Sequence, residues 1–151
     1  MKRSLDGGFE LDDDPGRIDV EAVHRFLAED SYWARGRSLT DMQQLLAEAA
    51  RVIGLYREGA QVGFCRAARC TPALYYLADV YVLPGHRGRG LGTQLVREMV
   101  ERGPLARSSW ILHTLDAHEL YRKLGFEEPS SRVLERRAPA GKEDAPPLEP
   151  L

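Results

Sequence analysis

Apolar residues along the chain recur with two different periods, which predict both helices and strands. A period of three to four residues is typical of an amphipathic helix. It occurs in three segments, at residues 19–29, 39–49 and 91–102. Ser38 stands directly before the second segment and is a suitable N-cap. We therefore expect three helices, each with one apolar face.

Short runs rich in β-branched and aromatic residues predict strands. These runs lie at residues 52–56, 61–66, 74–82 and 109–113, with weaker strand patterns at 9–11 (an edge strand) and 132–137. Glu58 and Gly59 separate the first two runs, so we expect those strands to form a hairpin. Residues 12–16 are acidic and end in Pro-Gly, which predicts a solvated turn.

The order of the predicted elements is β-α-α-β-β-β-α-β-α-β, which indicates an α/β (α+β) protein. Residues 1–137 are expected to form a single domain. Residues 138–151 hold four prolines and no apolar period, so we expect a disordered tail.

Composition and charge exclude several classes of function. The chain has 151 residues, 43% of them hydrophobic, and a net charge of −2, which offers no case for nucleic-acid binding. It contains no apolar run of about 18 residues and no signal-peptide pattern, so we expect no membrane association. Cys65 and Cys70 are too few for a disulfide framework or a zinc site, and no histidine pair has metal-ligand spacing. We expect a cytoplasmic protein without a metal.

A glycine-rich turn lies between a predicted strand and a predicted helix. The apolar run at residues 80–82 stops at Pro84, and the turn Arg87-Gly88-Arg89-Gly90-Leu91-Gly92 then leads into the helix. The first N–H groups of a helix lack partners, and its dipole is positive at that end. Glycine allows close approach to the backbone, so the turn predicts a pyrophosphate site. The turn lacks the Gly-Lys-Ser/Thr of a Walker loop and the glycine spacing of a Rossmann fold.

A second motif lies about thirty residues further on. Residues 116–126 predict a short helix with one apolar face, a capping box formed by Asp116 and Glu119, and a left-handed stop at Gly125.

Both motifs resemble hallmarks of the GNAT superfamily of N-acetyltransferases. Arg87-x-x-Gly90-x-Gly92 is similar to the acetyl-CoA motif of that family, and the segment from Leu120 to Phe126 (Leu-Tyr-x-Lys-x-Gly-Phe) is similar to its second hallmark. The resemblance covers about residues 18–128. It implies a mixed, mostly antiparallel sheet with helices on both faces.

The resemblance also implies a set of coenzyme contacts. Main-chain groups of the strand would bind the pantetheine arm and polarise the thioester carbonyl, and amides of the turn would bind the pyrophosphate. Asp116 stands where relatives often have an asparagine near the pantetheine arm. The implied acetyl-CoA residues are Val80, Tyr81, Val82, Arg87, Gly88, Arg89, Gly90, Leu91, Gly92, Thr93 and Asp116.

Two residues are candidates for proton transfer. The resemblance implies that Tyr121 is the general acid for the leaving thiolate; an ordinary tyrosine, with a pKa of about 10, is protonated at neutral pH. Its alternative is a packed helix residue. Asp79 is a candidate base that faces the acceptor, or a structural acid bound to backbone or arginine. Many relatives deprotonate the amine through water, and His113 is a weaker candidate.

The acceptor side is expected in the connection between the first two helices. Tyr32 and Trp33 are the candidate substrate contacts there, together with Asp79; alternatively, the two aromatic residues fill the core. An inward Arg35 or Arg37 would favour an acceptor with a carboxylate or phosphate. If Asp30 and Asp79 instead dominate the charge of the acceptor side, a cationic amine such as a polyamine would be favoured.

The sequence therefore predicts an acetyl-CoA-dependent N-acetyltransferase that acts on the primary amine of a small molecule by direct transfer in a ternary complex. Two alternatives stay open: a non-catalytic acyl-CoA sensor, and an acetyltransferase of protein N-termini or lysines. The predicted strand at 132–137 could pair with a second copy, so a homodimer is a further expectation.

Overall fold

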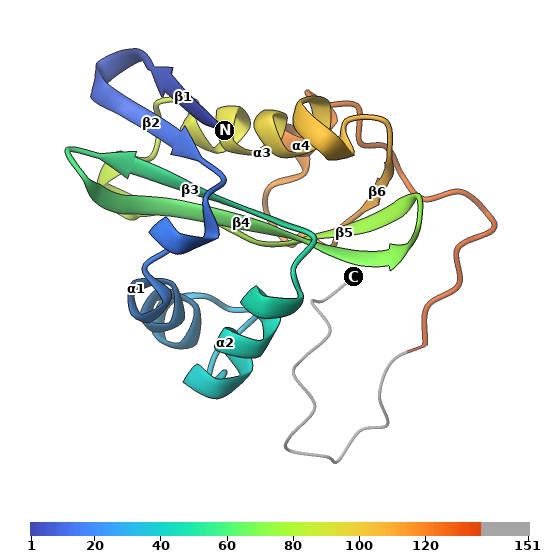
Figure 1. Cartoon of the computed structure of the whole chain (residues 1–151). Coiled ribbons are helices and arrows are strands. Elements are labelled where there is room, and N and C mark those ends of the chain that lie inside the picture. The colour runs from blue at the N-terminus through green and yellow to red at the C-terminus, as the bar shows by residue number, and fades with distance from the viewer. Residues whose placement is uncertain (137–151) are drawn as a thin grey trace.

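Six strands form a single mixed sheet in the computed structural model, which describes residues 1–136 (Figure 1). They follow one another across the sheet in chain order. The strands are β1 (Lys2–Leu5), β2 (Phe9–Asp12), β3 (Arg51–Arg57), β4 (Ala60–Thr71), β5 (Leu74–Val82) and β6 (Ser109–Ile111). Neighbouring strands are antiparallel except β5 and β6, which are parallel. The predicted fold class is confirmed.

Helices cover both faces of this sheet (Figure 1). α1 (Val20–Arg25) continues into a π-helical turn (Phe26–Asp30), and together with α2 (Leu39–Glu48) it lies on one face. α3 (Leu91–Glu101) and α4 (His118–Arg122) lie on the other face. None of the helices in the described part of the chain is both long and apolar enough to cross a membrane.

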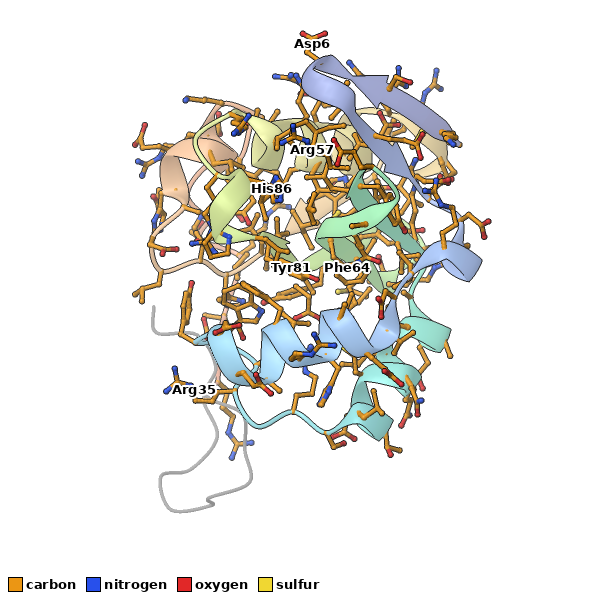
Figure 2. The ribbon with its side chains drawn as sticks, turned by 90° about the vertical axis from the view of Figure 1, so that its left-hand side faces the viewer. Asp6, Arg35, Arg57, Phe64, Tyr81 and His86 are labelled. Carbon is orange, nitrogen blue, oxygen red and sulfur yellow. The ribbon has the colours of Figure 1, made fainter. Side chains whose placement is uncertain are left out.

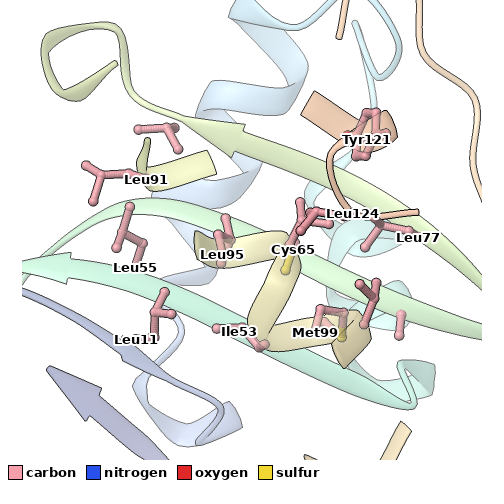
Figure 3. Packing of buried hydrophobic residues seen from close by; sticks show 14 of the residues in the cluster. Leu11, Ile53, Leu55, Cys65, Leu77, Leu91, Leu95, Met99, Tyr121 and Leu124 are labelled. Atoms are coloured by element: carbon pink, nitrogen blue, oxygen red, sulfur yellow. The ribbon is translucent and has the colours of Figure 1, made fainter. Parts of the chain in front are cut away.

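Each face of the sheet has its own hydrophobic core. Figure 3 shows the larger one, in which Leu95 and Met99 of α3 pack against Ile53 and Cys65 of the sheet. Phe64 and Tyr81 point to the opposite face, toward the helices α1 and α2 (Figure 2). Successive side chains of β4 and β5 point to opposite faces of the sheet, so both strands contribute residues to both cores.

Local signals account for the helix starts. The Ser38 side chain accepts a hydrogen bond from the Asp41 amide at 3.0 Å, as its position in the sequence predicts. Asp19 caps α1 in the same way through the amide of Ala22, also at 3.0 Å. Gly125, with φ of 82°, is in the left-handed conformation that ends the last helix.

The N-terminal region differs from its prediction. Residues 2–5 form β1, which pairs with β2, so β2 lies inside the sheet and not at its edge. The acidic segment after β2 is not simply a solvated turn, because Asp12 is buried and its carboxylate lies 2.6 Å from Nη1 of Arg17. Arg17 is only five residues further along the chain, but the pattern of apolar and polar residues does not show that the two side chains pair.

Two predictions near the C-terminal end are also wrong. Residues 132–136 form no strand, and Arg137 and the predicted tail at 138–151 lie outside the described residues. The Asp116–Glu119 capping box does not form, because α4 begins at His118 and the amide of Ala117 donates to Thr114 instead.

The sheet opens between β5 and β6. Their pairing covers only three residues of each strand and ends at Tyr76 and Ile111, whereas β5 continues to Val82. A register shift between β4 and β5 lies at Asp79, whose φ is +54°. Because β6 ends early, the last part of β5 has no neighbour on its β6 side among the described strands.

Candidate functional site

A cavity of about 710 Å³ occupies the place where β5 and β6 part. Its walls come from β5, the start of α3, α4, the connection before α4, and the connection between α1 and α2. Two segments far apart in sequence, the glycine-rich turn and the residues after α1, thus face one cavity. The sequence predicted both as parts of the site.

The glycine-rich turn forms one end of the cavity. Gly88 and Gly90 have φ of 75° and 74°, a conformation that side chains rarely adopt. Gly90 is the N-cap of α3, and no side chain caps its first turn. A Cβ built on Gly88 or Gly90 would meet no atom within 4 Å, so the space in front of the turn is open. Open space, free helix amides and a positive dipole fit a diphosphate group.

The absence of a side chain at Gly92 allows two helices to pack closely. A Cβ at this position would lie 3.1 Å from Cδ1 of Leu120, because α3 and α4 approach closely here. This packing brings Tyr121 of α4 to the wall of the cavity, where its side chain is buried and its ring meets the edge of Phe126 at 5.6 Å.

The predicted coenzyme residues divide into two groups. All of them line the cavity except Arg89, which is exposed and outside its wall. Arg87 does line it, but its Nε donates to the carbonyl of Val82 at 2.8 Å, so this arginine also braces the turn against β5. Asp116 lies at the exposed rim.

Asp79 lies at the centre of an ion cluster. One of its carboxylate oxygens, Oδ2, is 2.6 Å from Nε of Arg66 and 2.8 Å from Nη1 of Arg37. The other, Oδ1, accepts from Nε1 of Trp33 at 3.2 Å. Burial by itself would raise the pKa of Asp79, but the charges and hydrogen bonds of Arg66 and Arg37 outweigh it and lower the pKa. These contacts favour the structural alternative for Asp79 over a general base.

The connection between α1 and α2 reaches across the cavity. The Tyr32 hydroxyl accepts from the amide of Leu115 at 3.0 Å, on the far side, and its ring meets Trp33 edge-on at 4.9 Å. Arg37 points inward to Asp79, whereas Arg35 points away from the body of the protein (Figure 2). Tyr32 and Trp33 are therefore part of the cavity wall, and Trp33 also packs against the hydrophobic core beneath α1 and α2.

Sequence reasoning missed several residues of the site. Arg66 and Tyr76 line the cavity, and neither was singled out. A signal for Arg66 existed, since an arginine interrupts an otherwise apolar strand there. Among the described residues, no group of three or more His, Cys, Asp or Glu side chains could hold a metal ion.

Comparisons with known proteins agree with this geometry. The profile of a family described as "Acetyltransferase (GNAT) domain" matches residues 48–128. A curated protein of Gibberella zeae, a proposed acetyltransferase, is 27% identical over an aligned region that covers 81% of each chain.

Solved structures give the same result. A proposed acetyltransferase of the GNAT family from Xanthomonas campestris pv. campestris is 32% identical, with a TM-score of 0.75 over 87% of this chain and 94% of that one. An aminoglycoside acetyltransferase from an uncultured soil metagenomic sample shares the fold at 23% identity, with a TM-score of 0.61 over 88% of this chain and 99% of that one.

Proposed function

The chain belongs to the GNAT family of acetyltransferases, and we propose that it transfers the acetyl group of acetyl-CoA to the primary amine of a small molecule. The observation that carries this proposal is the single cavity between β5 and β6, which the glycine-rich turn, Tyr121 and the residues after α1 all line. Donor and acceptor would therefore meet in one cavity, as direct transfer in a ternary complex requires.

Acetyl-CoA supplies an activated acetyl group as a thioester. The amides from Arg87 to Thr93 would hold its pyrophosphate, and the main-chain groups of Val80, Tyr81 and Val82 would hold its pantetheine arm. Their position supports this assignment, because the segment lines the cavity where β5 has lost its neighbour. An N–H of this segment would meet the charge that develops on the carbonyl oxygen.

Tyr121 is the proposed general acid. Its hydroxyl would give a proton to the sulfur as the carbon–sulfur bond breaks, so that the thiol leaves and not the thiolate. Burial in the cavity wall supports this role. Asp79 would act as an anchor, holding Arg37 and Trp33 over the acceptor half.

The acceptor half carries an excess of positive charge on buried and partly buried side chains. Arg37 and Arg66 face one carboxylate, that of Asp79, which leaves a single positive charge. Asp30 also lines the cavity but is exposed, where water screens its charge. We therefore favour an acceptor amine that also bears a carboxylate or phosphate over a polyamine.

Thermal unfolding with and without acetyl-CoA tests the donor site. Ligand at about 100 times its Kd stabilises a protein by about 2.7 kcal/mol, which raises the midpoint by about 5–10 °C at this size. Gly90→Glu should abolish that shift. Gly59→Glu is the matched control, because Gly59 also has a positive φ and open space but lies in the β3–β4 turn.

A panel of amines then tests transfer. Acetylation of small amines, with a preference for those that carry an acidic group, supports the proposal. A thermal shift without turnover of any amine, peptide or protein would instead favour the acyl-CoA sensor. Turnover of protein substrates alone would favour an acetyltransferase of protein N-termini or lysines.

A further inference from the structure

Three side chains that the roles above do not use form a hydrogen-bonded series, of which Tyr76 and His113 line the cavity and Glu135 lies behind His113. The Tyr76 hydroxyl lies 2.9 Å from Nδ1 of His113, and Nε2 of His113 lies 3.4 Å from Oε2 of Glu135. With a carboxylate at Nε2, the neutral imidazole carries its proton there and accepts at Nδ1. Tyr76 is then the donor to His113.

This series of side chains begins where β5 and β6 part. Tyr76 and Ile111 form the last pair between β5 and β6, and His113 comes two residues after Ile111. Tyr76 and His113 both line the cavity that also holds Tyr121. An amine bound in the acceptor half would therefore be able to pass a proton to Tyr76 and on to His113, away from acetyl-CoA.

The reaction needs such a path. An alkylammonium group resembles a lysine side chain, with a pKa of about 10, and has no lone pair for attack until it loses a proton. Asp79 is poorly suited to accept that proton, because Arg66 and Arg37 stabilise its charged form and lower its pKa.

We propose that Tyr76 and His113 deprotonate the acceptor amine, with Glu135 holding the imidazole; this proposal rests on the acetyltransferase function proposed above. The nitrogen of the amine gives a proton to the Tyr76 oxygen, while the Tyr76 hydroxyl proton moves to Nδ1 of His113. The lone pair left on the nitrogen forms the new bond to the acetyl carbon, the carbon–sulfur bond breaks, and the sulfur leaves with the proton that Tyr121 donates. The second proton, which the nitrogen loses as the amide forms, returns to Tyr121 through water. The carboxylate of Glu135 stabilises the resulting imidazolium, which returns its proton to water, since the side chain is 23% exposed.

Several other ionisable groups surround this pair. Glu135 faces His113 from the segment after α4, and Tyr76 faces it from β5. The other charged or titratable residues that line the same cavity are Asp30, Tyr32, Arg37, Arg66, Asp79, Tyr81, Arg87, Asp116 and Tyr121. Among the residues that line the cavity, His113 is the histidine, the residue type that most often acts as a general base.

Two amines that differ in basicity test the proposal. One is the best primary alkylamine from the panel, and the other is its aminooxy analogue, in which an oxygen precedes the amino group and leaves it uncharged at pH 7. His113→Asn keeps an amide near the position of Nδ1 but cannot take a proton. We expect kcat for the alkylamine to fall by about 100-fold, within the range for general-base catalysis, with loss of the acidic limb of its pH profile. The rate for the aminooxy analogue should fall less than about 5-fold.

Tyr76→Phe is expected to reproduce this selective loss, and Glu135→Gln a smaller one. His118→Asn is the matched control, since His118 is exposed on α4 and outside the cavity wall. Equal losses with both amines would show a structural role and overturn the proposal, as would a His113→Asn variant that behaves like the control.

The unmutated protein separates this proposal from the proposed function. If it binds acetyl-CoA and acetylates the alkylamine while His113→Asn is as active, the proton path alone is wrong. If it acetylates no amine at all, both proposals are wrong. Unfolding midpoints of all variants within about 2 °C of each other would exclude misfolding as the cause of a loss.

Discussion

Asp79 combines two effects in one residue. Its φ of +54° belongs to the left-handed region, which aspartate and asparagine tolerate better than most residues. The resulting shift of register turns its carboxylate toward Arg66 and Arg37. The same residue that distorts β5 therefore fixes the two arginines of the acceptor half.

Asp79→Asn should destabilise the protein by about 3–5 kcal/mol at pH 7, because it leaves the buried guanidinium group of Arg66 and the partly buried one of Arg37 without their counter-charge. The pKa of Asp79 is lower in the folded protein than its ordinary value of about 3.9, so its contribution is complete above that pH and is lost as the pH falls through the folded pKa. The free energy of unfolding in urea, measured at several pH values, tests this pH dependence.

The difference between Asp79→Asn and the unmutated protein should therefore shrink on acidification. A difference that grows at low pH would contradict this account. Asp116→Asn is the control, since Asp116 is exposed at the same cavity and its replacement should change stability by less than about 0.5 kcal/mol.

Tyr121→Phe should lower kcat by about 100-fold and leave the Kd of acetyl-CoA nearly unchanged, because it removes a proton donor but keeps the packed ring. Steady-state kinetics and calorimetry measure the two quantities. Tyr75→Phe is a matched control, being buried in the same core but outside the cavity wall. Equal loss of binding and turnover in Tyr121→Phe would make the residue structural.

At the scale of elements, the cavity exists because strands and connections end at different places. β6 stops at Ile111 while β5 runs on to Val82, and the residues after α1 cross the gap to reach the connection before α4. The hydrogen bond from the amide of Leu115 to the Tyr32 hydroxyl links these two connections. This link should hold the acceptor side closed.

Tyr32→Phe removes the acceptor of that hydrogen bond. A bond worth about 1 kcal/mol corresponds to a factor of about five, so the KM of the amine should rise about fivefold while the Kd of acetyl-CoA stays the same. Tyr56→Phe is the control, because the Tyr56 hydroxyl also bonds to backbone, the carbonyl of Arg17 at 3.0 Å, but away from the cavity. A parallel change in the Kd of acetyl-CoA would argue against a link that acts on the acceptor alone.

At the scale of the whole molecule, one buried ion cluster joins the N-terminal region, the sheet and α3. Arg51 of β3 donates to the carbonyl oxygens of Glu98 and Arg102 at 2.8 and 2.9 Å, and to the Asp13 carboxylate at 2.9 Å. Arg3 of β1 lies 2.6 Å from the carboxylate of Glu98, whose side chain is 1% exposed. The cluster therefore ties the C-terminal half of α3 to β1 and β3.

Arg51→Met should lower the free energy of unfolding by about 3–5 kcal/mol, because Glu98 and two carbonyl groups lose a buried partner. The double variant Arg51→Met, Glu98→Met should be less destabilised than the sum of the single variants. Denaturant unfolding measures both. Arg97→Met, which breaks a partly exposed pair with Glu101, should cost less than about 1 kcal/mol, and a similar cost for Arg51→Met would contradict the assigned role.

The sequence by itself determined the elements whose signals are local. The α2 helix begins after Ser38, β5 spans Leu74–Val82, and α3 begins after Gly90, all as periodicity and capping predict. Membership of the GNAT family was evident from the sequence for the same reason. Its motifs are short segments in which backbone conformation and chemistry are set by neighbouring residues, as at Gly88 and Gly90.

Only the tertiary structure decided which side chains meet. Arg66 and Arg37 reach Asp79 from a different strand and from a distant connection, and Tyr76 meets His113 across the parallel pair β5–β6. β1 was missed because a four-residue strand is stabilised by its neighbour and not by its own pattern. Contacts between residues far apart in the chain depend on strand register and on where each strand ends, and neither quantity is encoded in a local period.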